Sequence, residues 1–236
     1  MADDEALEKR FATEAQVYDN KATQDENAAD AYDSSASSHE SKGDSQVRDA
    51  QRHLRKAGKK SDQAAQYDRD AKEHEKAEEE HDKAAKKLKG QDKEDELDAA
   101  QAEANKAAKA RDEASKAHNE AASEYLAAAN AFIAAATEYA AASGDYNLAA
   151  LRYGIAAQER SMERKKWKAA YDETDDKDAE RRYSANVEAC KSEATSDKRQ
   201  QRAETTAKGS VDRDAQDAKD AADLANDAST AELQKR

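Results

Sequence analysis

The sequence contains no proline, one cysteine and six glycines among its 236 residues. A long chain without proline is typical of either extended helix or disorder. The lone thiol, Cys190, has no partner for an internal disulfide or for a paired-cysteine zinc motif. The glycines are scattered singly, so no phosphate-binding glycine loop is present. These absences exclude a disulfide scaffold, a zinc finger and a nucleotide-binding loop.

Charged residues account for 39% of the chain, and the formal net charge is −13. Binding to the phosphate backbone of nucleic acids requires clustered positive charge, so we expect no nucleic-acid partner. Much of the 37% apolar fraction is alanine, whose burial removes little surface from water. Stability must therefore come from helix propensity and close helix packing, because a thick apolar core is not available.

Between residues 97 and 170 the same types of side chain recur every seven positions, and this pattern indicates helix instead of disorder. One row carries mostly large side chains, and a second row, three residues further on, is almost wholly alanine. Residues at these spacings share one helix face, and the repeat lasts about ten heptads, as in a coiled coil. The large row of this expected packing seam contains Leu97, His118, Tyr125, Phe132, Tyr139, Tyr146, Tyr153 and Trp167. The alanine row contains Ala107, Ala114, Ala121, Ala128, Ala135, Ala142, Ala149 and Ala156.

Turn-forming residues divide the rest of the chain. The serine run 34–38 with Gly43, then Gly90, the acidic stretch 172–178 and Gly209 favour breaks between helices. Gly144 keeps the heptad phase on both sides, so we expect it inside a helix, with a kink or hairpin as the alternative. The expected helices span residues 2–38, 46–89, 92–171, 178–207 and 211–234.

The sequence thus predicts an all-α protein, an elongated antiparallel helical bundle or coiled-coil rod that forms a single unit over residues 1–236. The first two helices together match the third in length, which favours a chain that folds back on itself. The competing arrangement is an open chain whose seams are filled by other copies.

Histidines are the strongest chemical candidates in the sequence. His74 and His81 are seven residues apart, which places them about 10 Å apart along a helix, too far to share one metal ion. With a turn at Gly90, Tyr67 is expected near His118. His118 and Arg111 are expected to be polar seam residues that fix the register of the helices. Protonation of such a histidine would make the bundle sensitive to mildly acidic pH.

No catalytic motif, cofactor-binding residue or metal site is recognisable, so we expect a protein that is not an enzyme. The pattern favours a structural or assembly protein whose rods build a homomeric filament, surface coat or virion component. The partners would be copies of the chain or other helical subunits. A stress-protective hydrophilic protein and a lipid-surface protein using residues 125–157 are the alternatives. No leader or transmembrane segment is visible, and the localisation stays open between the cytoplasm and an extracellular or virion assembly.

Overall fold

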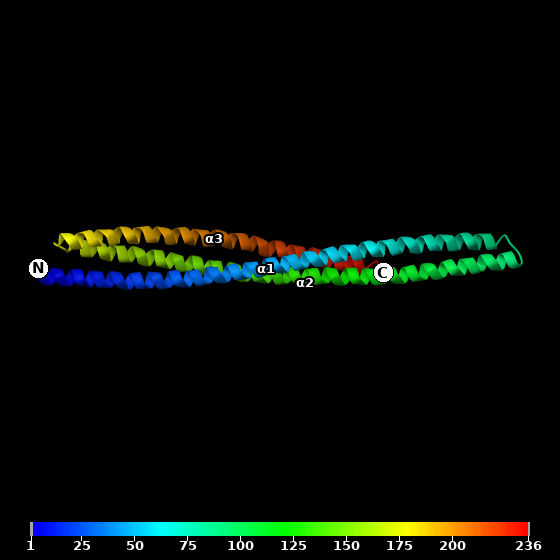
Figure 1. The fold of residues 1–236 in the computed structure, drawn as a ribbon, viewed down its shortest axis with the longest axis horizontal. Helices are drawn as coiled ribbons and strands as arrows, with labels where there is room; N and C mark the ends of the chain where they lie inside the picture. Colours follow the sequence, from blue (N-terminus) through cyan, green and yellow to red (C-terminus); the bar gives the residue numbers. More distant parts are fainter. Residues whose placement is uncertain (1, 236) are drawn as a thin grey trace. The chain divides into compact units, whose positions relative to one another are not determined.

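The computed structural model describes residues 2–235, with side chains from Glu5 onward. The fold is all-α: α1 spans Ala2–Ala85, α2 spans Gln91–Asp172 and α3 spans Lys177–Leu233. Consecutive helices pack antiparallel, and the described residues contain no strand (Figure 1). This confirms the predicted fold class.

The chain divides into two compact units, and all three helices contribute to both. Unit 1 comprises Met1–Gly43 and Ala136–Gln216. Unit 2 comprises Asp44–Ala135 and Asp217–Arg236. The expectation of one helical unit over the whole chain stays a prediction.

Two of the predicted breaks do not occur, because the buried heptad rows continue through them. Gly43 occupies the place in α1 that alanine takes at residues 36 and 50, and it is buried. A Cβ at Gly43 would lie 2.7 Å from Cε1 of Tyr139. Glycine is therefore required here to admit an aromatic ring from α2, and it does not mark a turn. Gly209 likewise lies inside α3, between Glu204 and Val211, which are both buried on one row.

The breaks at Gly90 and at the acidic stretch do occur. The first helix ends at Ala85, four residues before the predicted end, and Gly90 has a left-handed φ of 68° that suits glycine. The second turn lies between Asp172 and Lys177, where the Asp176 carboxylate accepts a 2.8 Å hydrogen bond from the amide of Asp178. That contact caps the start of α3. Gly144 lies within α2, as predicted.

Alanine rows on α1 and α2 form the centre of each unit. In unit 1, Ala36 packs with Ala142 and Ala29 packs with Ala149, and all four side chains are fully buried. The two residue numbers add to 178 in both pairs, which defines one antiparallel register. In unit 2 the buried row of α1 continues through Ala50, Ala57, Ala64 and Ala71. Small side chains at every seventh position let the two helices approach closely.

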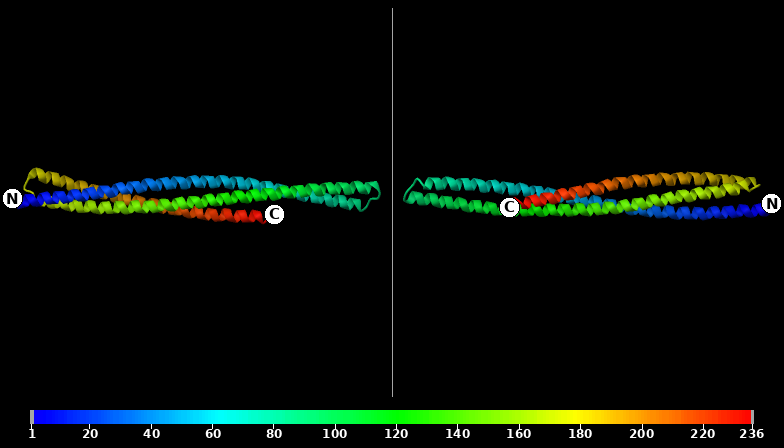
Figure 2. Two further views of the ribbon diagram at one scale, coloured as in Figure 1. Left: turned by 90° about the horizontal axis from the view of Figure 1, so that it is seen from below. Right: turned by 180° about the vertical axis from the view of Figure 1, so that it is seen from behind.

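The third helix covers only part of unit 2. Its penultimate helical residue, Glu232, contacts His118 of α2. Figure 2 shows the C-terminal end of α3, in red, stopping well short of the turn that joins α1 to α2. The start of α2 is therefore paired with α1 beyond the end of α3.

Candidate functional site

Most of the large row of α2 lies where the three helices meet, so we describe this row first. His118, Phe132, Tyr139, Tyr146 and Tyr153 are buried, whereas Tyr125 and Trp167 are half-buried. Contrary to expectation, Leu97 is 44% exposed, because this part of the row lies beyond the end of α3. The predicted alanine row, residues 107 to 156 at intervals of seven, is buried throughout.

Tyrosines in this row pass between α1 and α3 and hydrogen-bond to acids on α1. The Tyr146 hydroxyl donates to the Glu40 carboxylate at 2.9 Å, and the Tyr153 hydroxyl donates to Asp30. Burial raises the pKa of both phenols. The polar tips are therefore satisfied while the rings fill the space that alanine leaves.

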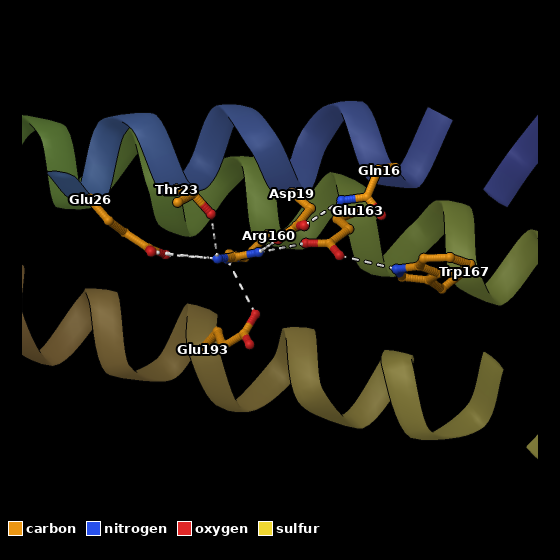
Figure 3. A network of polar contacts seen from close by, with 8 residues as sticks. All are labelled: Gln16, Asp19, Thr23, Glu26, Arg160, Glu163, Trp167 and Glu193. Carbon is orange, nitrogen blue, oxygen red and sulfur yellow. Dashed lines mark hydrogen bonds and ion pairs between the residues drawn. The ribbon is translucent and has the colours of Figure 1, made fainter. Parts of the chain in front are cut away.

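Arg160 is the most connected side chain of unit 1, and it is only 6% exposed. Its guanidinium is paired with Asp19, with Glu26 at 3.1 Å, with Glu163 at 3.1 Å and with Glu193 at 3.3 Å, so carboxylates from all three helices converge on it (Figure 3). Burial alone would lower the pKa of Arg160, but the hydrogen-bonded carboxylates of Asp19 and Glu163 raise it. We infer that this cluster fixes the register of unit 1.

An aromatic pair lies next to the Arg160 cluster. Glu163, which interrupts the alanine row, accepts a 3.1 Å hydrogen bond from the indole of Trp167 (Figure 3). Trp167 stacks on Tyr183 of α3 with 5.6 Å between ring centroids. The Tyr183 hydroxyl in turn donates to Glu8 of α1, so this layer also joins all three helices.

The core row of α3 carries two buried acids that the sequence analysis did not identify. Asp197 is 4% exposed and Glu204 is 8% exposed. Among the described residues, neither Oδ2 of Asp197 nor Oε2 of Glu204 has a hydrogen-bond partner. Burial, with the charge of Glu26, raises the pKa of Asp197 to about 6. Burial, with the charges of Asp33 and Asp30, raises the pKa of Glu204 to about 7. The heptad position of these acids was the only available signal.

His118 forms the corresponding polar layer of unit 2. It is 2% exposed, and its Nδ1 lies 2.6 Å from Glu232 of α3, while its Nε2 lies 3.2 Å from Asp68 of α1. Only an imidazole with a proton on each nitrogen donates to both carboxylates. Asp68 is the next residue along α1 from Tyr67, the neighbour that the sequence predicts for His118. Arg111, the other expected register residue, is exposed and paired with Glu75.

The remaining four histidines lie on one heptad row of α1, and each lies next to a glutamate of α2. The ring nitrogen to carboxylate distances are 2.6 or 2.7 Å in every pair. In each pair the residue numbers of the two partners add to 177. The cation–π pair Phe11–Lys166 and the ion pair Asp25–Arg152 give the same sum. The pairs are His39–Glu138 in unit 1 and His53–Glu124, His74–Glu103 and His81–Glu96 in unit 2. Polar pairs therefore repeat the register of the alanine rows along one edge of the seam.

Between positions 137 and 162, the outward side of α2 carries no exposed charged residue. All ten exposed residues between positions 137 and 162 are uncharged, although 39% of the chain is charged. Two of the nearby charged side chains, Glu138 and Arg152, are paired with residues on α1, and Asp145 is half-buried. We call this surface the uncharged α2 face. Its residues are Thr137, Ala140, Ala141, Gly144, Asn147, Leu148, Leu151, Gln158, Ser161 and Met162.

No catalytic constellation emerges from these clusters. Within residues 5–235, no group of three or more His, Cys, Asp or Glu side chains is placed to hold a metal ion. Cys190 is buried, and burial raises the pKa of its thiol to about 12, which keeps it in the unreactive protonated form. No described helix contains an apolar stretch long enough to span a bilayer.

Comparison with family models, with curated proteins and with solved structures gives no match to this chain.

Proposed function

We propose that this chain is a non-catalytic structural protein that builds a larger homomeric assembly, such as a filament, a surface coat or a virion component. The observation that carries the proposal is the uncharged α2 face of unit 1. A helix face that only contacts water would normally carry charged side chains, as the exposed sides of α1 and α3 do. Instead, Leu148 and Leu151 are exposed, Leu151 to 56%.

A second copy of the chain is the occupant that fits this face best. Two molecules of net charge −13 repel each other wherever their charged surfaces meet. The uncharged α2 face is the part of unit 1 where that repulsion is weakest. This face contains three residues with small or no side chains: Ala140, Ala141 and Gly144. A neighbouring helix can therefore approach it closely, as the alanine rows allow inside each unit.

The size of this face argues for an assembly of many copies over an isolated dimer. From Ala140 to Met162 the helix rises about 33 Å, and a helix is about 10 Å wide, so a contact covers roughly 330 Å² on each partner. A stable pair normally buries about 1,200–2,000 Å² in total, which is about two to three times the area that this face supplies on both partners. One contact is therefore weak, and repeated contacts among several copies are needed for a lasting assembly.

Sedimentation velocity over a range of protein concentrations tests this proposal. We expect the wild-type protein to associate as its concentration rises, and the double variant Leu148→Lys, Leu151→Lys to stay monomeric. The control is Leu224→Lys, which replaces a leucine on α3 of unit 2 that is 71% exposed, and this variant is expected to associate like the wild type.

A wild-type protein that stays monomeric up to millimolar concentration would contradict the proposal. Equal loss of association in the double variant and the control would mean that the uncharged α2 face is not the contact. Flotation of the wild type with neutral lipid vesicles, abolished in the double variant, would assign the face to lipid instead.

A further inference from the structure

Unit 1 contains an acidic cavity that its helices leave open to solvent. Its volume is about 290 Å³, and it lies between α1, α2 and α3. Four carboxylates line it together with one phenol and one guanidinium: Glu26, Asp30, Glu193, Asp197, Tyr153 and Arg160. Its lining residues thus carry net negative charge when the acids are ionised.

The single cation in the cavity does not neutralise it. Arg160 is already paired with four carboxylates, two of which, Glu26 and Glu193, also line the cavity (Figure 3). Asp30 accepts a hydrogen bond from the Tyr153 hydroxyl. Asp197 is more than nine-tenths buried, and among the described residues its Oδ2 has no hydrogen-bond partner. This oxygen is therefore a hydrogen-bond acceptor without a donor in the described part of the chain. Because burying an ionised carboxylate without a partner costs free energy, a ligand that supplies a donor would be favoured here.

An ammonium group suits this acceptor better than a metal ion. A carboxylate accepts hydrogen bonds only, so the ligand must donate, and it must be positive to balance the surrounding acids. A metal ion needs several oxygens at about 2.0–2.6 Å, and no such group occurs among the described residues. An alkylammonium has three donors at hydrogen-bond distances of about 2.7–3.2 Å and tolerates looser geometry.

A second acceptor of this kind lies one heptad further along α3. Glu204 is on the same buried row as Asp197 but outside the residues that line the cavity, and its Oε2 also lacks a partner among the described residues. Seven helical residues separate the two acids by about 10 Å along the axis. The buried ring of Tyr153 lines the cavity and offers apolar surface to an alkyl chain.

The geometry points to a binding site for a linear polyamine, with one ammonium group at Asp197 and a second directed toward Glu204. This inference does not depend on the proposed assembly function. The ligand would replace the missing counter-charge between α1 and α3 and so hold α3 against the other two helices.

Isothermal titration calorimetry with spermidine at pH 7.5 and fixed ionic strength tests the site. We expect saturable binding to the wild type, at least tenfold weaker binding to Asp197→Asn, and unchanged binding to Glu188→Gln, which removes an exposed acid from the same helix. Magnesium chloride at equal ionic strength is expected to compete weakly. At pH 5 binding should be lost, because Asp197, whose pKa is about 6, then carries a proton. The charged groups that surround Asp197 in the cavity are Glu26, Asp30, Glu193 and Arg160.

Thermal melting of the same proteins shows that the variant is folded. Without ligand, Asp197→Asn should melt at a higher temperature than the wild type, because a buried unpaired charge is gone. Three results would overturn the inference: no saturable heat at pH 7.5, equal affinity of all three proteins for spermidine, or displacement of spermidine by magnesium at equal concentration. The first would mean that Asp197 takes up only a proton, and the other two that the acidic surface attracts cations without a site.

Discussion

At the scale of single residues, unit 1 combines a buried seam of alanine side chains with a polar layer in which carboxylates outnumber cations. Arg160 supports this layer because it is the one cation that four carboxylates share. Three of those carboxylates, on Asp19, Glu26 and Glu193, still reach water, whereas Glu163 is buried. Removal of the guanidinium therefore leaves Glu163 buried without a counter-charge, with the Trp167 indole as a remaining donor, and leaves the other three acids in a repulsive group.

We predict that Arg160→Met lowers the free energy of unfolding by about 3 kcal/mol, the lower end of the cost of removing one partner from a buried ion pair. Urea denaturation at pH 7.5 followed by circular dichroism measures this. The control is Arg152→Met. In the native protein Arg152 pairs with Asp25 at 2.7 Å, and its side chain is 43% exposed. Loss of this exposed pair should lower the free energy of unfolding by less than about 1 kcal/mol. Similar losses in both variants would show that burial of Arg160 has no energetic consequence.

The buried acids of α3 give unit 1 a definite dependence on pH. The pKa of Glu204 is about 7 in the folded state and that of Asp197 is about 6, both above their ordinary values. Between the ordinary and the raised pKa the folded state binds more protons than the unfolded state, so stability increases as the pH falls. The window lies between about pH 7 and the ordinary carboxylate range.

We predict that the melting temperature rises when the pH is lowered from 8 to 5.5, and that Glu204→Gln raises the melting temperature at pH 8 and flattens this rise. The measurement is a series of thermal melts by circular dichroism. Glu188→Gln, which removes an exposed acid, should leave the slope unchanged. The opposite sign, a loss of stability on acidification, would show that the paired carboxylates dominate over Glu204 and Asp197. The proposed sensitivity of His118 to acid stays a prediction.

At the scale of the helices, the sequence was sufficient for α2 and misleading at two other points. The heptad rows from residue 97 onward predicted a helix at 92–171, and α2 spans Gln91–Asp172. The break near Gly43 was wrong because glycine has two uses, as a helix terminator and as space for a neighbour. Only knowledge of the register, which brings Tyr139 against Gly43, distinguishes them.

Parts of the site were also beyond the reach of sequence reasoning. The acids on α3, such as Asp197, recur at heptad spacing with Cys190 and Val211, but acids elsewhere in the chain follow the same spacing on solvated faces. Which row is buried depends on how α3 lies on the α1–α2 pair, and no residue of α3 alone decides this. The uncharged α2 face overlaps the apolar window at residues 125–157, whose outward orientation required the structure.

Two glycines give a matched test of the helix interpretation. We predict that Gly43→Ala destabilises the protein by about 1–3 kcal/mol, because the new Cβ would overlap the buried ring of Tyr139. Gly209→Ala meets no atom within 4 Å and should stabilise by about 0.4–1 kcal/mol, as expected when glycine is replaced inside a helix. Urea denaturation of both variants measures the difference. Stabilisation by Gly43→Ala would show that Tyr139 does not pack there.

At the scale of the whole molecule, net charge and the uncharged α2 face act in opposite directions. The charge of −13 keeps copies of the chain apart over long range. The face attracts only at contact, through apolar surface that salt does not screen. The balance between the two therefore depends on ionic strength.

We predict that association becomes stronger when sodium chloride is raised from 20 to 500 mM. The added salt shortens the screening length from about 20 Å to about 4 Å and so removes most of the repulsion between copies. Light scattering at one protein concentration in both buffers measures the change in mean mass. The double variant Leu148→Lys, Leu151→Lys should remain monomeric in both, because screening does not restore the lost apolar contact. If the wild type instead dissociates as salt is added, ion pairs hold the copies together, and the contact must lie on the charged surfaces of α1 and α3.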